Sequence, residues 1–545
     1  MAGDATWRRD DHADAIRSAG SFDVVVVGGG VTGAGAALDL AARGLRVALV
    51  ERGDFAQGTS SRSTKLFHGG IRYLPHYEFT LVAEGLREQR ILHEIADFLY
   101  EPLEFVIPLY EHRGIADAPD WACRGWRAPL ALRAGLVLYD ILGGPGRPGE
   151  RHRRADVDEV LALAPSLDPG GLTGGFVYSD AQTDDARLVV TLVKTAVGGH
   201  GALAAGRMRA DALRPASGGY VVDVTDLESG EPFEIRSRAV LLATGAFTPP
   251  GLPGAEPMRL VRSKGAHLIV ELERLGMGDR AIVLPETDDG RVLYIIPWLG
   301  HAMVGTTDDP YDGDPLHPRV DEHEVEYLIR HVRSYLAIPP FEPLSVFAGL
   351  RALAAGDGHT ARASREHVVD EPAPGVVRVA GGKLTTYRRI AAEASDRVAK
   401  ALGATEPSPT RDLPLVGSGA ARRPLERRLE TARVSAMAAA AIAGRYGGEA
   451  ARVASLVEDR PELAEPLTDG RSIAAEVVHA VRHEGAVAIS DVTLRRTHLA
   501  WFSTDHARKD AERIAELMGI ELGWSEDERR RRVADHETEL EAEGL

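Results

Sequence analysis

Three glycines and an acid have the types and spacing needed to bind a dinucleotide. Gly28, Gly30 and Gly33 form the pattern G-x-G-x-x-G, and Glu51 follows about 20 residues later. The first glycine permits a tight turn, the second lets the backbone approach a pyrophosphate, and the third lets a helix pack closely on a strand. An acid at this place binds ribose hydroxyls and disfavours a 2′-phosphate, which favours FAD or NAD over NADP. The alternative is a glycine-rich turn without a ligand.

The elements that must position these residues are visible in the same stretch. Residues 23–27 are a β-branched run, residues 36–41 have a helical pattern, and residues 47–51 form a second apolar run. Strand, helix and strand in this order predict a βαβ unit, whose helix would offer its free N–H groups to the phosphates.

The next segment favours FAD over NAD. Residues 58–74 read GTSSRSTKLFHGGIRYL, a stretch rich in hydroxyl groups and glycines that a plain NAD-binding domain does not need. The segment resembles the one that runs under the flavin in the glycine-oxidase-like FAD family. Within that family, it is similar to the FAD-dependent (aerobic-type) glycerol-3-phosphate dehydrogenases.

Further motifs of this family follow in order, and they extend the resemblance over roughly residues 21–510. They are Y-S-D at 178–180, D-D-A-R-L at 184–188, L-L-A-T-G-A at 241–246, I-P-W at 296–298, V-G-T-T-D at 304–308, G-L-R at 349–351, S-R-E at 364–366 and G-G-K-L-T-T-Y-R at 381–388. So many motifs in one order argue against coincidence.

The resemblance implies oxidation of sn-glycerol 3-phosphate to dihydroxyacetone phosphate. A hydride would pass from C2 to N5 of FAD, and the electrons would then pass to a membrane quinone. The alternatives are a glycerol-3-phosphate oxidase that makes hydrogen peroxide from oxygen, an amino-acid oxidase on the same fold, and a catalytically silent flavoprotein scaffold. We find no inserted segment of the kind those glycerol-3-phosphate oxidases carry. Intact motif residues argue against a silent scaffold.

Arginines in three of these motifs are candidates for phosphate binding, because a guanidinium group matches phosphate oxygens in pairs. The resemblance places Arg72, Arg351 and Arg365 on the substrate side, whereas the alternative for each is a surface or interdomain ion pair. Family members commonly have proline after the arginine of the G-x-R motif, but Ala352 stands here. We therefore expect a loop of altered shape after Arg351, which leaves the choice of phosphorylated polyol open.

His68 is the first candidate for the base, because its motif lies near the flavin and an imidazole titrates near neutral pH. The alternative is a histidine that only bonds the flavin or the backbone. Lys383 and Arg351 could lower the pKa of the substrate alcohol, and Lys383 could also stabilise the anionic reduced flavin. Tyr73 and Thr385 are further candidates for substrate contact.

The predicted cofactor-binding residues lie mainly in three segments: the glycine turn (residues 28–33), the flavin loop (residues 58–74) and the closing motif (residues 381–388). They are Gly28, Gly30, Gly33, Glu51, Thr59, Ser60, Ser61, Lys65, Gly245, Gly381, Gly382, Leu384 and Thr385.

Composition narrows the class of protein. The chain has 545 residues, 44% of them hydrophobic, which is enough for two or three domains with sizeable cores. A formal net charge of −17 argues against a nucleic-acid partner. Cys123 is the only cysteine, which excludes an intrachain disulfide and a Cys-pair redox mechanism and fits the cytoplasm. We expect no metal site, since four C-terminal histidines read as solvated helix residues: His479, His483, His498 and His506.

The predicted fold class is α/β. We expect a discontinuous Rossmann-type FAD-binding domain at 21–100, 170–260 and 346–400, and an inserted substrate domain with an antiparallel sheet at 101–169 and 261–345. A mostly helical C-terminal domain should occupy 405–545 and could form a homodimer contact. Residues 1–20 read as a disordered extension without a signal peptide, and the charged tail 525–545 is expected to fray.

Residues 121–142 combine tryptophans, arginines and leucines, a mixture that suits either a bilayer interface or a helix packed on the core. The resemblance favours the interface. We therefore expect a cytoplasmic protein held peripherally at the inner face of the cell membrane, with no membrane-spanning helix.

Overall fold

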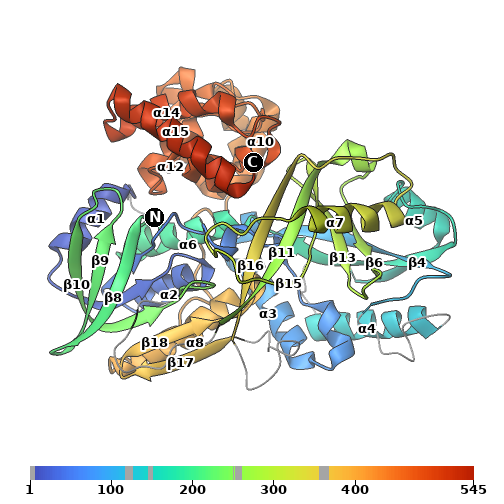
Figure 1. The fold of residues 1–545 in the computed structure, drawn as a ribbon, viewed down its shortest axis with the longest axis horizontal. Coiled ribbons are helices and arrows are strands. Elements are labelled where there is room, and N and C mark those ends of the chain that lie inside the picture. Colours follow the sequence, from blue (N-terminus) through green and yellow to red (C-terminus); the bar gives the residue numbers. More distant parts are fainter. Residues whose placement is uncertain (1–5, 117–126, 145–150, 249–250, 252–259, 355–366) are drawn as a thin grey trace.

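The computed structural model describes residues 6–116, 127–144, 151–248, 251, 260–354 and 367–545. Two sheets lie side by side, and a separate group of helices lies at the top of the view (Figure 1). The predicted division into a Rossmann-type domain, a second sheet domain and a helical C-terminal domain is confirmed.

The first sheet is the nucleotide-binding one. Its central strands are parallel and almost fully buried, as expected for β-branched runs covered on both faces. Helices α2 (Val31–Ala42), α6 (Asp185–His200) and α8 (Tyr387–Ala401) pack together over it. The strand order is β17 (Val368–Ala373), β18 (Val376–Ala380), β10 (Pro232–Leu242), β1 (Phe22–Val27), β2 (Val47–Val50) and β7 (Leu203–Ala205), with β8 (Met208–Ala216) and β9 (Gly219–Asp226) continuing from β10.

The second sheet is mostly antiparallel, with one parallel pair, β12 (Ala281–Leu284) and β4 (Glu101–Tyr110). Helices α5 (Val157–Leu163) and α7 (Glu322–Tyr335) cover one face, and α3 (Phe79–Ile95) and α4 (Arg127–Gly143) cover the other (Figure 1). Its order is β15 (Asp309–Pro310), β11 (Leu260–Glu271), β14 (His301–Gly305), β13 (Leu293–Trp298), β12 (Ala281–Leu284), β4 (Glu101–Tyr110), β6 (Leu172–Gln182) and β3 (Leu66–Phe67), with β16 (Ser345–Ala354) beside β11 and β5 (Arg153–Ala155) beside β6.

Two strands expected in the FAD-binding domain belong to the second sheet instead. The strands β6 and β16 fall in ranges predicted for the FAD-binding domain, but they pair with β4 and β11 in the second sheet. Both strands contact the flavin loop: Leu66 and Phe67 pair with the end of β6, and Thr59 bonds Leu350 of β16. The second sheet therefore reaches directly into the cofactor site.

The C-terminal domain has a hydrophobic core of its own. Its α15 does not fray as expected, since it runs from a Ser525 cap to Glu543 with Leu540 fully buried. The helices are α9 (Arg422–Thr431), α10 (Ala436–Tyr446), α11 (Ala450–Asp459), α12 (Ala474–His483), α13 (Leu499–Phe502), α14 (Arg508–Leu522) and α15 (Glu526–Glu543), with a π-helical turn at Asp491–Arg496.

The expectation of a disordered N-terminal extension is wrong for the described residues 6–20. Helix α1 (Arg9–Ser18) packs beside β7 and β10, and its Arg9 forms a buried ion pair with Asp226. Trp7 is buried, donates its indole N–H to the Ala204 carbonyl at 3.0 Å and packs against Phe55. Apolar burial thus outweighs the polar composition of this segment.

Among the residues with described positions, no helix is long and apolar enough to span a bilayer.

Candidate active site

The glycine turn between β1 and α2 leaves no room for side chains. Gly28 has φ 110°, and a Cβ there would lie 2.4 Å from the Ala243 carbonyl oxygen on the neighbouring strand. A Cβ on Gly33 would lie 1.8 Å from the Gly28 oxygen, so only glycine lets α2 pack onto the turn. Gly30 caps α2 and has no side chain to cover the first N–H groups of that helix. These are the roles that the spacing predicts.

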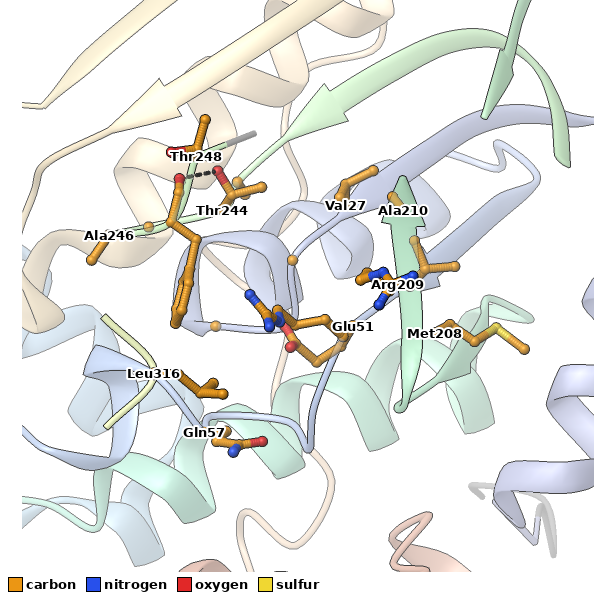
Figure 2. A pocket seen from close by; sticks show the side chains of 18 of the residues that line it. Val27, Glu51, Gln57, Met208, Arg209, Ala210, Thr244, Ala246, Thr248 and Leu316 are labelled. Atoms are coloured by element: carbon orange, nitrogen blue, oxygen red, sulfur yellow. Dashed lines mark hydrogen bonds between the residues drawn. The ribbon is translucent and has the colours of Figure 1, made fainter. Parts of the chain in front are cut away.

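A cavity of about 360 Å³ opens beside this turn, at the ends of β1, β2 and β10 (Figure 2). Glu51 lies in it, and its carboxylate accepts hydrogen bonds from the N–H groups of Gly29 at 2.5 Å and Gly53 at 2.8 Å. Burial raises the pKa of Glu51, and the two backbone hydrogen bonds oppose that rise. Bare glycines, a helix N-terminus and an acid around one cavity fit the adenosine and pyrophosphate of FAD.

The sequence reading missed the far wall of this cavity. Residues 208–211 of β8 and residues 246–248 line it, together with Leu316 from the second domain (Figure 2). Arg52 lies over the Phe247 ring, 5.3 Å from its centroid. No local motif marks residues 208–211, because β8 enters the site only through the pairing of β8, β9 and β10.

The flavin loop is tied to three parts of the molecule. The Thr59 hydroxyl donates to the Leu350 carbonyl at 2.6 Å, and the Ser60 hydroxyl accepts from the Val31 N–H at 2.9 Å. Lys65, predicted to bind cofactor, lies buried with its ammonium 2.6 Å from Asp185 and 3.0 Å from the Ser61 carbonyl. These contacts make Lys65 a support of the loop.

A buried hydrogen-bond network holds the H-G-G turn at residues 68–70, the next part of the flavin loop. The Gly69 N–H donates to the Tyr139 hydroxyl at 2.8 Å, and that hydroxyl donates to Asp180 at 2.7 Å. The Gln89 amide also donates to Asp180, at 3.0 Å. Asp180 therefore organises the turn that carries His68, a role that its motif alone did not reveal.

The closing motif meets the H-G-G turn across more than three hundred residues. The Thr385 hydroxyl accepts from the His68 N–H at 3.1 Å and lies 3.2 Å from the His68 carbonyl oxygen, to which it can donate. The ammonium of Lys383 lies 3.6 Å from the centroid of the Tyr73 ring. The positive φ values of Gly381 and Gly382 turn the chain between β18 and this contact. Four predicted residues, His68, Tyr73, Lys383 and Thr385, are thus brought together.

Arg351 lies at a polar cluster on β11 and β16. Its guanidinium group is 3.0 Å from the Asp308 carboxylate and donates to the Thr307 carbonyl at 3.3 Å. A Cβ on Gly265 would lie 2.8 Å from Arg351 Nη2, so glycine makes room for this side chain. Arg351 is one-third exposed and keeps access to a ligand.

His267 is a second residue that the sequence reading missed. It is buried beneath the flavin loop, where Nε2 lies 3.2 Å from the Thr64 hydroxyl and the ring stacks on Phe347. Burial and the nearby charges of Arg351 and Lys65 lower the pKa of His267 to about 3. A neutral imidazole is therefore present between the loop and Arg351 at physiological pH. Its place in an alternating strand gave only a packing signal.

Two further arginines, Arg72 and Arg365, were predicted to bind the phosphate. Arg72 is half-buried in the short helix Ile71–His76 after the H-G-G turn. Arg365 lies outside the described residues.

The D-D-A-R motif joins this site to the C-terminal domain. Asp185 fixes the flavin loop through Lys65 and Ser63, while its neighbour Asp184 accepts from His498 at 2.9 Å. Arg187 forms a buried ion pair with Glu484. The expectation of solvated histidines is wrong for His498 and His479, which are both buried at this interface.

Comparison with known proteins agrees with this geometry. Residues 23–394 match the family described as FAD dependent oxidoreductase, and residues 408–529 match the C-terminal domain of alpha-glycerophosphate oxidase. Glycerol-3-phosphate dehydrogenase 2 of Mycobacterium tuberculosis is 36% identical over 538 residues, which cover 96% of this chain and 89% of that protein. Glycerol-3-phosphate dehydrogenase of Synechocystis sp. is 32% identical, covering 93% of this chain and 94% of its own.

A solved structure extends the likeness to the whole fold. The glycerol-3-phosphate dehydrogenase from Bacillus halodurans, complexed with FAD, superposes with a TM-score of 0.78 at 26% identity and covers 98% of this chain and 97% of its own. The L-alpha-glycerophosphate oxidase of Mycoplasma pneumoniae shares the fold, with a TM-score of 0.54 at 18% identity over 73% of this chain and 99% of its own.

Proposed function

Because the chain belongs to the FAD-dependent oxidoreductases and, within them, to the glycerol-3-phosphate dehydrogenase family, we propose that it oxidises sn-glycerol 3-phosphate to dihydroxyacetone phosphate. The observation that carries the proposal is the similarity of nearly the whole chain, both sheet domains and the helical domain, to relatives of that name. FAD, when bound, supplies the acceptor for the hydride that leaves C2.

The phosphate of the substrate would be bound by Arg351, with Arg72 and Arg365 as further candidates. A dianionic phosphate is stronger competition for a guanidinium group than a single carboxylate, because it offers more acceptor oxygens and more charge. We infer that phosphate shares or displaces Asp308 at Arg351. The bare backbone of Gly265 supports this role, since a Cβ there would lie 2.8 Å from Arg351 Nη2 and would take the space of the guanidinium group.

His68 is our candidate for the base that receives the C2 hydroxyl proton. Support for its position comes from Thr385, which bonds both backbone polar groups of His68 and so fixes where its side chain begins. Lys383, beside Tyr73, would stabilise negative charge on the substrate oxygen as the proton leaves. His68 would then accept the proton while Lys383 stabilises the negative charge that remains on the substrate oxygen.

We propose a membrane quinone as the electron acceptor and α4 as the membrane-facing element. One stripe of α4 is buried against the protein, and the opposite stripe exposes apolar side chains together with two arginines: Leu130, Val137, Ile141, Arg127 and Arg133. Tyr77, just before the adjacent α3, and Phe79, the first residue of α3, are exposed as well. Apolar groups beside arginines suit a bilayer with anionic lipids. Residues 121–126 of the predicted segment lie outside the described residues.

The chemistry is tested by product and acceptor together. Purified enzyme with sn-glycerol 3-phosphate and a soluble quinone analogue should form one dihydroxyacetone phosphate for each quinone reduced, with little hydrogen peroxide in air. Rapid peroxide formation with slow quinone reduction would instead make it an oxidase, the activity named for the family matched by residues 408–529.

The membrane surface is tested by co-sedimentation with anionic phospholipid vesicles. Ile141→Asp should weaken binding, while Ile520→Asp on α14 is the matched control, because the two isoleucines are similarly exposed, at 67% and 60%. Equal binding of both variants and the unaltered protein would remove α4 from the proposal.

A further inference from the structure

The end of α15 reaches into the flavin loop. Glu543, the last residue of this helix, places its carboxylate 2.5 Å from the guanidinium group of Arg62. Both side chains are almost fully buried, at 2% and 6% exposed. Arg62 follows directly after the Thr59–Ser61 turn, which is predicted to contact the cofactor. A residue of the C-terminal domain thus touches the cofactor loop.

Arg62 joins the flavin loop to β16, the strand that carries Arg351. Its guanidinium group donates to the Ala348 carbonyl at 3.4 Å and to the Gln57 carbonyl at 3.3 Å. A Cβ on Gly349 would lie 2.4 Å from the Arg62 carbonyl oxygen, so loop and strand are in backbone contact. Together with the bond from Thr59 to the Leu350 carbonyl, these contacts fix the loop against the strand just before Arg351.

Glu543 supplies the charge that this arrangement requires. Arginine stays protonated at any physiological pH, and a buried guanidinium group without an ionised partner is costly. Burial alone would raise the pKa of Glu543, but Arg62 and His317 lower it to about 2. The pair is therefore ionised throughout the neutral range. Carbonyl oxygens are the other partners of Arg62 among the residues whose positions are described.

The helix end itself is held firmly. Leu540 is fully buried in the core of the C-terminal domain, and Arg508 of α14 pairs with Glu537. The Glu541 carbonyl accepts from Arg319 of the second sheet domain at 2.9 Å. Glu543 is therefore presented to Arg62 by a rigid element that contacts two domains.

We propose that Glu543 is a positioning residue for the cofactor site: by fixing Arg62, it holds the flavin loop against β16 and aligns the bound FAD with Arg351. The part that concerns FAD rests on the family of the chain, and the part that concerns Arg351 rests on the proposed function. The C-terminal domain then acts in catalysis without contributing a group to the reacting atoms.

The test compares Glu543→Gln with Glu541→Gln, an exposed glutamate two residues earlier on the same helix. Apoprotein of each is titrated with FAD by flavin fluorescence, and the visible absorption and circular dichroism of the bound flavin are recorded without substrate. We expect E543Q to bind FAD about tenfold to a hundredfold more weakly, as loss of one charge-assisted bond implies, and to shift the flavin bands. E541Q should match the unaltered protein. FAD binding and flavin bands of E543Q that match E541Q would overturn the proposal.

A double variant separates positioning from charge burial. Arg62→Met with Glu543→Gln removes both charges, so it should recover folding if E543Q alone fails to fold. Because the anchor is still missing, we expect its FAD affinity to stay reduced. Wild-type FAD affinity in the double variant would show that only charge neutrality matters and would sink the positioning role. FAD binding needs no substrate, so this outcome is independent of which alcohol the enzyme oxidises.

Discussion

The nucleotide half and the flavin half of this site are built in different ways. In the nucleotide half, the four predicted residues Gly28, Gly30, Gly33 and Glu51 come from one βαβ unit of about thirty residues, and β8 with residues 246–248 adds the far wall. The flavin half needs Arg351 from β16, the H-G-G turn after β3, the closing motif after β18 and supports from the C-terminal domain. Bare backbone forms the first half, whereas paired charges and hydroxyl groups form the second.

The difference teaches where each half is vulnerable. A backbone cradle fails where an added atom meets other backbone, as at Gly28 and Gly33, because packed backbone cannot move aside. A charged site fails when an atom is removed, because a buried partner is left uncompensated. Substitutions of opposite kinds should therefore disable the two halves with different signatures.

The most complete loss of activity should come from adding one methyl group to the glycine turn, because an enzyme without FAD has no turnover at all. Gly33→Ala would put a Cβ 1.8 Å from the Gly28 oxygen, forcing α2 away from the turn. We expect FAD affinity to fall by at least about a hundredfold, measured by flavin content and fluorescence titration. Gly199→Ala in α6 is the control, since a Cβ there meets nothing within 4 Å. Full flavin content in G33A would contradict the claim that the glycine turn has no room for a side chain at Gly33.

Removal of the Arg351 charge should leave FAD in place. Arg351→Ala should keep the yellow protein but lower kcat/KM for glycerol 3-phosphate about a thousandfold, or about 4 kcal/mol of transition-state stabilisation. The kcat/KM of Arg351→Lys should lie between those of Arg351→Ala and the unaltered enzyme, because lysine keeps the charge but loses the paired donors. Arg214→Ala, an exposed arginine paired with Asp223, is the control. Unchanged turnover in R351A would remove Arg351 from the site.

A smaller effect is expected at the candidate base. His68→Gln should slow anaerobic flavin reduction by about a hundredfold, within the range for loss of a general base. The absorption spectrum should remain that of bound flavin, because the Thr385 bonds involve only the His68 backbone. Stopped-flow absorbance measures the rate; an unaltered rate would assign His68 a structural role only.

The smallest effect should appear as a pH dependence away from the site. His536 on α15 is buried, and neither of its ring nitrogens has a hydrogen-bond partner among the described residues; burial lowers its pKa to about 4. The unfolded chain binds a proton below pH 6.5 whereas the folded chain does not, so stability declines as pH falls from 6.5 toward 4, by at most about 1.4 kcal/mol per pH unit. His536→Leu should flatten this part of the curve in denaturant titrations. An unchanged slope would contradict the account of this histidine.

The nucleotide half could be predicted from the sequence more fully than the flavin half. The glycine turn and its flanking strands were predictable, because spacing along the chain becomes spacing in space within one βαβ unit. The residues around Arg351, above all Asp308 and His267, were not, because they meet through strand pairings between distant segments. The roles of Asp180 and Asp185 as supports likewise depend on partners far along the chain.

Two further misreadings have one physical cause. Residues 6–20 and the tail after 525 are polar in composition, yet Trp7 and Leu540 are buried. A few apolar anchors and buried ion pairs order such segments once a partner surface exists. Composition averages over these anchors and so predicted disorder at both ends.

The measurement that tests the central claim most directly is anaerobic reduction of the purified yellow protein. On addition of sn-glycerol 3-phosphate, the absorption band of the oxidised flavin should disappear rapidly, while glycerol and lactate, which lack the phosphate, should leave it unchanged. A band that persists with glycerol 3-phosphate, or that disappears equally with glycerol, would contradict the proposed substrate and leave the FAD-binding fold without an assigned reaction.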